Sequence, residues 1–114
     1  MLIQVCRAKI HRAHLTGAHL DYEGSISICP DLLKASGIRV YERVQVVNIA
    51  NGSRLETYVI EGKRGKIDLN GAAARLGQVG DLIIIIAYAL IDPDKEPIPD
   101  PTFVHVDSEN RIRP

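Results

Sequence analysis

The sequence lacks most of the features on which nucleic-acid-binding and membrane proteins depend. It has no Trp, one Phe and four Tyr, which is too few for a base-stacking platform. Its 14 basic and 14 acidic side chains cancel, so no basic excess is left for phosphate contacts. The longest apolar run, Leu82 to Ile91, is shorter than the roughly 20 residues that a membrane helix needs. We therefore expect neither a nucleic acid nor a membrane as a partner.

Cysteine is also scarce. Cys6 and Cys29 are the only two, and their spacing fits neither a disulfide framework nor a zinc site. The N-terminal residues turn polar too soon for a signal peptide. Both observations favour reduced thiols and a cytoplasmic location. The 114 residues, 46% hydrophobic and 25% charged, are typical of one folded domain.

Short apolar or alternating segments separated by glycine predict a mainly β fold. The pattern predicts strands over residues 2–7, 9–15, 25–28, 42–49, 55–60, 67–69 and 82–87. A helix is expected from Pro30 to Ser36, with Gly37 taking a positive φ at its end, and another from Gly71 to Leu76. Asn51-Gly52 predicts a tight type I′ hairpin turn. Six or seven short strands with two or three short helices indicate a small closed β-barrel.

The composition changes at Asp92, after which five of the six prolines and an excess of acidic residues are found. We expect residues 1–91 to form the barrel and residues 92–114 to form a Pro-rich acidic tail. Within this tail, Phe103 to Val106 is expected to add one edge strand.

Three groups of residues suggest chemistry, and each has a plainer interpretation. His11, His14 and His19 with Cys6 could bind a metal, but the spacing favours ordinary polar positions. The small side chains after Gly71 either leave backbone N–H groups free for a carboxylate or allow close packing. Arg54 and Tyr58 share one face of a strand, where they either line a pocket or are simply exposed.

Gly24-Ser25 is usually no more than a loop, but it allows one unusual reaction. A serine hydroxyl that follows a flexible glycine can attack the preceding carbonyl, which converts the amide into an ester. Elimination and hydrolysis then leave an N-terminal pyruvoyl group. The dipeptide alone is weak support for this reaction.

Four segments, in order, resemble the pyruvoyl-dependent aspartate 1-decarboxylases. The first runs from Lys9-Ile10-His11-Arg12 through Tyr22-Glu23-Gly24-Ser25-Ile26. The others are residues 48–58 (NIANGSRLETY), residues 70–75 (NGAAAR) and residues 80–85 (GDLIII). The resemblance covers about residues 1–91.

The resemblance implies a double-psi β-barrel that assembles as a homotetramer with active sites between subunits. It implies a zymogen that cleaves itself into residues 1–24 and 25–114, leaving a pyruvoyl group in place of Ser25. That ketone forms a Schiff base with L-aspartate, and the lyase reaction yields β-alanine and CO₂ for pantothenate and coenzyme A synthesis. The enzyme would need neither pyridoxal phosphate nor a metal.

The resemblance also assigns roles to individual residues. Ser25 is the catalytic pyruvoyl precursor, and Tyr58 is the catalytic proton donor. The implied substrate-binding residues are Arg54, Thr57, Gly71, Ala72, Ala73, Lys9 and His11. The implied processing residues are Gly24, Ser25, Thr57, Tyr22 and Asn70.

One alternative remains open at this point. Small barrels of this kind also serve as non-catalytic binding modules, and a fold alone does not define a function. Two fragments on a denaturing gel would favour the enzyme, whereas one intact band would leave the binding module possible. Whether maturation needs a helper protein is also open.

Overall fold

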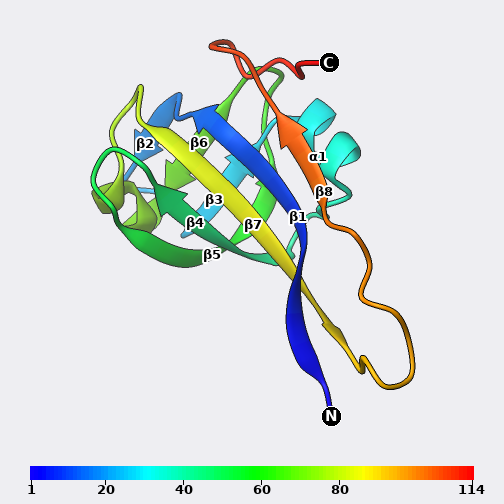
Figure 1. Ribbon diagram of the computed structural model, residues 1–114. Helices are drawn as coiled ribbons and strands as arrows, with labels where there is room; N and C mark the ends of the chain where they lie inside the picture. The colour runs from blue at the N-terminus through cyan, green and yellow to red at the C-terminus, as the bar shows by residue number, and fades with distance from the viewer.

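Eight strands and two short helices follow one another in the computed structural model, which describes residues 1–114 (Figure 1). The strands are β1 (Ile3–His14), β2 (Gly17–His19), β3 (Ser25–Ile28), β4 (Arg43–Asn48), β5 (Arg54–Glu61), β6 (Ile67–Asn70), β7 (Leu82–Ile91) and β8 (Thr102–His105). The helices are α1 (Pro30–Ser36) and the 3₁₀ helix η1 (Gly71–Leu76). No helix is long and apolar enough to cross a membrane.

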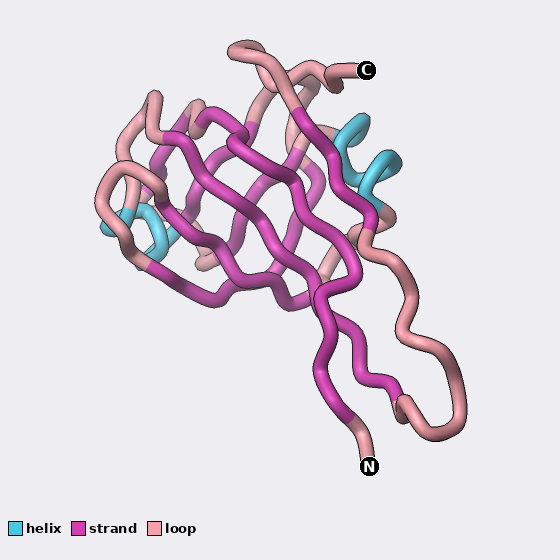
Figure 2. Tube along the Cα trace, in the orientation of Figure 1, coloured by secondary structure: helices cyan, strands magenta, loops and turns pink.

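The strands form one sheet in the order β2-β6-β3-β5-β4-β7-β1-β8. Leu15 and Thr16 lead the chain from β1, near one end of this order, to β2 at the other end. The backbone N–H of Leu15 donates to Asp81 and that of Thr16 donates to Ile67, at 2.9 and 2.8 Å. The first bond anchors the link beside β7 and the second beside β6, so this two-residue link brings the two ends of the sheet together, and the sheet curls into the small barrel that the sequence predicts (Figure 2).

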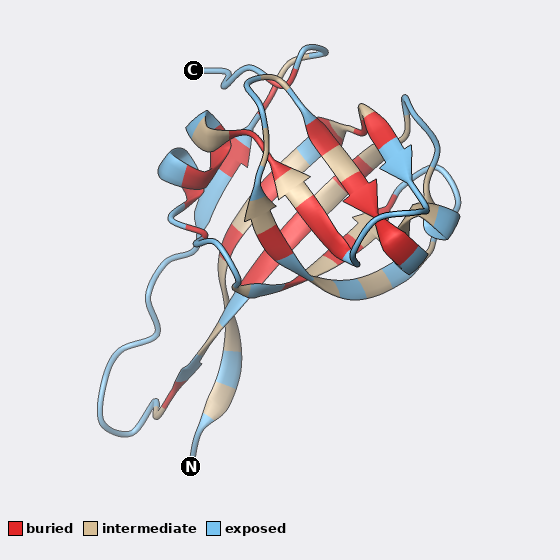
Figure 3. Cartoon of the chain, turned by 180° about the vertical axis from the view of Figure 1, so that it is seen from behind, coloured by how far each residue is buried: buried red, intermediate tan, exposed pale blue.

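The core fills the inside of this barrel. Alternate residues of the strands point inward, and the buried cluster holds 20 residues, most of them Ile, Val and Leu. Figure 3 shows the buried positions concentrated on the barrel strands. The opposite faces of β3 and β6 carry polar side chains, among them Ser25, Ser27 and Asn70. The core therefore supports a polar outer face at this part of the sheet.

One part of the sheet extends beyond the barrel. Residues 3–6 of β1 pair with residues 88–91 of β7, and Figure 1 shows this two-stranded arm running out to the N-terminus. A loop then returns the chain to β8, which pairs in parallel with β1 from Ala8 to His11. Val104 and Val106 are buried, and Asn110 exchanges hydrogen bonds with the backbone of His14. The edge strand expected near Phe103 is therefore confirmed.

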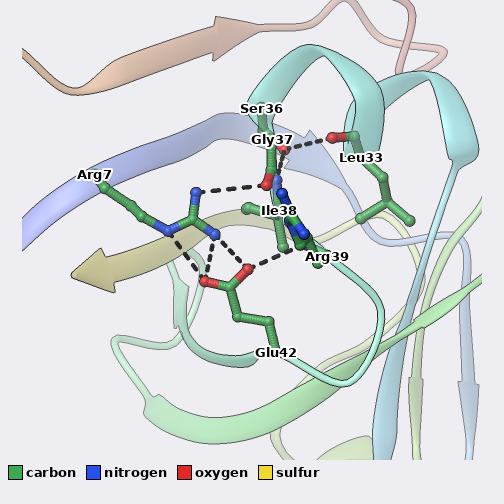
Figure 4. Close-up of polar contacts among 7 residues, drawn as sticks. All are labelled: Arg7, Leu33, Ser36, Gly37, Ile38, Arg39 and Glu42. Carbon is green, nitrogen blue, oxygen red and sulfur yellow. Dashed lines mark hydrogen bonds and ion pairs between the residues drawn. The ribbon is translucent and has the colours of Figure 1, made fainter.

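Helix α1 forms where the sequence predicts it. Pro30 occupies its first turn, and Gly37 ends it with a φ of 76° while donating to the Leu33 carbonyl at 2.9 Å. The following loop is fixed by Glu42, which pairs with Arg7 of β1 and accepts the Arg39 N–H at 3.0 Å (Figure 4). This contact ties the segment between α1 and β4 to the barrel wall.

Two details differ from the sequence-based expectation. There are eight strands rather than six or seven: the strands predicted over residues 2–7 and 9–15 form the single strand β1, the three-residue β2 was not predicted, and β8 adds to the sheet. The prediction of a type I′ turn at Asn51-Gly52 is wrong. Five residues, 49–53, connect β4 to β5, and among them only Gly52 has a positive φ, of 75°. The turn is wider because Asn51 uses its side chain to bind Ser53 N–H and the Leu76 carbonyl.

Candidate active site

Ser25 is the first residue of β3 and is buried, whereas Gly24 before it is exposed. The Ser25 hydroxyl donates to the Glu23 carbonyl at 3.1 Å and accepts a hydrogen bond from Asn70 Nδ2 at 3.0 Å. A Cβ placed on Gly24 would meet nothing within 4 Å. The structure therefore places a buried, hydrogen-bonded hydroxyl on the residue directly after the exposed Gly24.

Asn70 reaches Ser25 because the two residues are opposite each other in the antiparallel pair of β3 and β6. It is 2% exposed, and its amide also donates to Ser27 Oγ at 2.9 Å. Ser27 was not among the residues proposed from the sequence. The signal that could have found it is the spacing of Ser25 and Ser27, which puts both hydroxyls on one face of a strand.

Gly71 packs against the backbone of Tyr22 to Gly24, next to Ser25 and Asn70; we call this group of residues the Ser25 centre. It has a φ of 69°, and a Cβ built there would lie 2.7 Å from the N and Cα atoms of Gly24 and 2.9 Å from the Tyr22 carbonyl oxygen. Such distances leave no room for any side chain. Of the two interpretations of this segment, close packing is therefore confirmed at Gly71. Ala72 beside it is exposed and Ala73 is half-buried.

Helix η1 is also held at its other end. The Leu76 carbonyl accepts hydrogen bonds from Asn48, Asn51 and Ser53, at 3.0, 3.0 and 3.3 Å. All three donors belong to the end of β4 or to the turn that leads into β5. The Leu76 carbonyl thus joins η1 to the turn that precedes Arg54.

Asn48 is 2% exposed and also donates to Asp81 at 2.9 Å. This hydrogen bond, followed by one from the Gln78 N–H, lowers the pKa of Asp81 below its ordinary value, although partial burial opposes the shift. Neither Asn48 nor Asp81 stood out in the sequence, because both act through contacts between distant segments.

Strand β5 lies next to β3, with Val59 paired with Ile26 in parallel register. Tyr58 is therefore level with Ser25, and Thr57 precedes it. Tyr58 is 36% exposed and its ring lies 6.4 Å from that of Tyr41. Arg54, at the start of β5, is exposed and forms no ion pair within this chain. The strand presents Arg54 and Tyr58 on one open face.

Lys9 and His11 lie elsewhere, on β1, from which β7 and β4 separate β5 in the sheet order. Lys9 Nζ is 5.9 Å from the centre of the Phe103 ring, and the His11 ring is 5.5 Å from that of His105. Burial, followed by the nearby His105, Arg12 and Lys9, lowers the pKa of His11. Within one chain these two residues do not join the Ser25 centre.

The histidines that could have formed a metal site do not gather into one. His19 lies apart and contacts Asp68 at 2.9 Å. His11 and His14 line one pocket with His105. No group of three or more His, Cys, Asp or Glu side chains is arranged to hold a metal ion.

A pocket of about 910 Å³ borders the centre. Tyr22, Ser27 and Asn70 contribute to its wall, together with Lys63 and Lys66. Neither Arg54, Thr57 nor Tyr58 lines this pocket. Arg54 and Tyr58 are exposed on one face of β5, whereas Thr57 is half-buried on the other face.

Comparison with known proteins identifies the family of this chain. A family model described as aspartate decarboxylase matches residues 1–113. The chain is 54% identical to the aspartate 1-decarboxylase of Bdellovibrio bacteriovorus, over 98% of this chain and 90% of that protein. It is 52% identical to the enzyme of that name from Desulfotalea psychrophila, over 99% and 97%, and 56% identical to that of Caldicellulosiruptor bescii, over 98% and 89%. The chain belongs to the aspartate decarboxylase family.

Proposed function

We propose that this protein cleaves itself between Gly24 and Ser25 and then acts as a pyruvoyl-dependent aspartate 1-decarboxylase, which converts L-aspartate to β-alanine and CO₂. Membership of the family supports the activity. The observation that carries the mechanism is the buried Ser25 hydroxyl held by Asn70 directly after the exposed Gly24. It supports Ser25 as the nucleophile that attacks the preceding peptide bond.

Self-cleavage uses groups that are already in place. Ser25 Oγ bonds to the Gly24 carbonyl carbon, the peptide C–N bond breaks, and the hydroxyl proton passes to the nitrogen. Loss of the Ser25 Cα proton to a water base then breaks the Cβ–Oγ bond, and Oγ leaves as part of the Gly24 carboxylate. Water hydrolyses the remaining enamine and releases ammonia. Thr57 on the adjacent strand and Tyr22 beside Gly71 are the further residues that we assign to processing.

The residues around position 25 fit a pyruvoyl group. Position 25 lies opposite Asn70 in the strand pair, so the Asn70 amide would hold an oxygen of the group by a hydrogen bond. When formed, the group supplies an electron sink for the electron pair that remains as CO₂ leaves. Because it derives from Ser25, the reaction needs neither pyridoxal phosphate nor a metal.

The other assigned residues bind the substrate and move its proton. Arg54 offers a planar fork that suits a carboxylate, and Gly71 to Ala73 offer backbone N–H groups. Thr57 offers a hydroxyl on the same strand as Arg54. Tyr58, level with Ser25, donates its phenol proton to the carbon from which CO₂ has left.

We further propose a homotetramer in which each site lies between two subunits. Arg54 and Tyr58 face an open surface, while Lys9 and His11 lie on another part of the barrel. A second copy would bring its own Lys9 and His11 to the site, as closed symmetric assembly allows. We place the enzyme in the cytoplasm, where its free thiols stay reduced, and in the supply of β-alanine for pantothenate.

The activity is tested with two substrates that differ by one methylene. Fully cleaved protein is incubated with L-aspartate or L-glutamate, and the amino acid product and CO₂ are measured. We expect one β-alanine for each CO₂ from aspartate and much slower release from glutamate. A fully cleaved protein that releases no CO₂ from aspartate would contradict the proposal, and a single uncut chain without activity would favour the binding module.

A further inference from the structure

The Asn70 side chain gives its amide nitrogen to two serine hydroxyls, not one. Nδ2 lies 3.0 Å from Ser25 Oγ and 2.9 Å from Ser27 Oγ. We propose that Ser27 is a positioning residue for self-cleavage: its hydroxyl holds the Asn70 amide so that the N–H faces Ser25 Oγ. This inference rests on the self-cleavage described under the proposed function.

The geometry follows from the strand pair. Ser25 and Ser27 are two residues apart on β3, so they share a face, and β6 presents Asn70 opposite Ser25. Ser25 and Asn70 are 1% and 2% exposed, so water cannot readily replace either hydrogen-bond partner. Ser27 is half-buried and borders the pocket of about 910 Å³. Ser27 is therefore the most exposed of the three residues Ser25, Ser27 and Asn70.

The donors and acceptors of the three side chains match. An amide NH₂ carries two hydrogens, and here one is available to each serine oxygen. The Ser25 proton is directed to the Glu23 carbonyl, so the Ser25 oxygen is free to accept from Asn70. The terminal torsion of asparagine is broad, so the side chain turns easily unless hydrogen bonds hold the amide; here both hydrogen bonds are made by Nδ2. Without the Ser27 hydroxyl, one of the two restraints on Nδ2 is lost.

The orientation of Asn70 matters because charge develops on Ser25 Oγ twice. Oγ becomes electron-rich as it gives up its proton to attack Gly24, and again when it leaves Cβ with the Gly24 carboxylate. An N–H aimed at this atom stabilises both stages. An Asn70 amide turned to present its oxygen would repel the same charge. Ser27 does not touch the scissile bond, so it acts only through Asn70.

The test compares three variants of the complete chain. Ser27→Ala removes the hydroxyl, Ser27→Thr keeps it on a side chain suited to a strand, and Ser108→Ala removes an exposed hydroxyl far from the site. The cleaved fraction of each is followed over time on denaturing gels and by intact mass. Thermal melting of each uncut protein shows whether it is folded.

We expect Ser27→Ala to fold but to cleave about two- to twelvefold more slowly, the effect of one lost neutral hydrogen bond on a rate. Ser27→Thr and Ser108→Ala should cleave close to the parent rate. Parental cleavage by Ser27→Ala overturns the inference, and so does slow cleavage by Ser27→Thr, since packing rather than the hydroxyl would then be responsible. A parent protein that never cleaves would instead overturn the proposed function itself.

Discussion

At the scale of single residues, we propose Ser25 as the hydroxyl that cuts the chain. We predict that Ser25→Ala folds, stays as one chain of 114 residues and releases no CO₂ from aspartate, because it has lost the nucleophile. Denaturing gels and a CO₂ assay check both parts. Ser108→Ala, with its exposed hydroxyl, serves as the matched control and should cleave normally. A cleaved and active Ser25→Ala protein would refute the mechanism.

Tyr58 should matter for turnover and not for cleavage. Tyr58→Phe removes only the hydroxyl, so the ring keeps its contact with Tyr41. We expect the variant to cleave normally, but its kcat should fall by about 10²–10⁴, the usual loss for a positioned acid. The measurement is kcat per cleaved chain. A parental kcat would show that the proton comes from another group.

Arg54 provides the contrasting prediction on the same strand. Because its guanidinium is assigned to a substrate carboxylate, Arg54→Ala should mainly raise KM for aspartate while cleavage continues. Initial rates over a range of aspartate concentrations separate the two constants. An unchanged KM with a strongly reduced kcat would give Arg54 a different role.

At the scale of elements, η1 and the turn before β5 act as one unit. Asn48 joins them through the Leu76 carbonyl and Asp81. We predict that Asn48→Ala lowers the free energy of unfolding by about 1–3 kcal/mol, because it removes three hydrogen bonds of a buried side chain, to the Leu76 carbonyl, to Asp81 and from the Ala50 N–H. Asn51→Ala removes two hydrogen bonds of an exposed side chain, to the same carbonyl and from the Ser53 N–H, and should cost less. Denaturant unfolding measures the loss of stability in both variants. Equal losses would show that Asn48 is no more important than Asn51 for joining η1 to the turn.

Asp81, which is part of this unit, also makes the stability of the fold depend on pH. The pKa of Asp81 is lowered in the folded protein by Asn48 and the Gln78 N–H, so its carboxylate stabilises the fold above the ordinary carboxyl pKa. That contribution is lost as the pH falls through the lowered pKa. We expect the melting temperatures of the parent and Asp81→Asn to differ most above about pH 5 and to begin to converge only below about pH 4, as the pH falls toward the lowered pKa of Asp81. A difference that is constant with pH would contradict this role.

Local rules predicted some elements well and others poorly. Pro30 and Gly37 define α1 within the chain segment itself, so that helix was predictable to the residue. The turn at Asn51-Gly52 was not, because Asn51 binds the distant Leu76 carbonyl instead of adopting a positive φ. The three-residue β2 exists only through its pairing with β6, which no local pattern shows.

The residues of the candidate site were likewise predicted only in part from the sequence. Gly24, Ser25 and Asn70 were found by their resemblance to a family, and the structure brings them together. Ser27 and Asn48 were missed because their importance lies in contacts across the sheet. The assigned roles of Tyr58, Thr57 and Arg54 in catalysis stay predictions.

At the scale of the whole molecule, Lys9 and His11 lie away from β5. This separation allows a test of whether each active site is formed by two subunits. Lys9→Ala and Ser25→Ala are each expected to be inactive, or nearly so, as homotetramers. If each site uses Ser25 of one subunit and Lys9 of another, co-expression should restore activity at about a quarter of the sites in a random mixture. Activity no higher than that of the single variants would place both residues in one chain's site.

The central claim is that Ser25 becomes the pyruvoyl group of an aspartate decarboxylase, and the intact mass of the purified protein tests it most directly. The account predicts two chains, residues 1–24 with a free carboxylate and residues 25–114 lighter by one ammonia than the same chain beginning with serine. The lighter mass should disappear in Ser25→Ala. A single uncut chain that nevertheless forms β-alanine, or a cleaved chain that keeps an N-terminal serine and is fully active, would contradict the account.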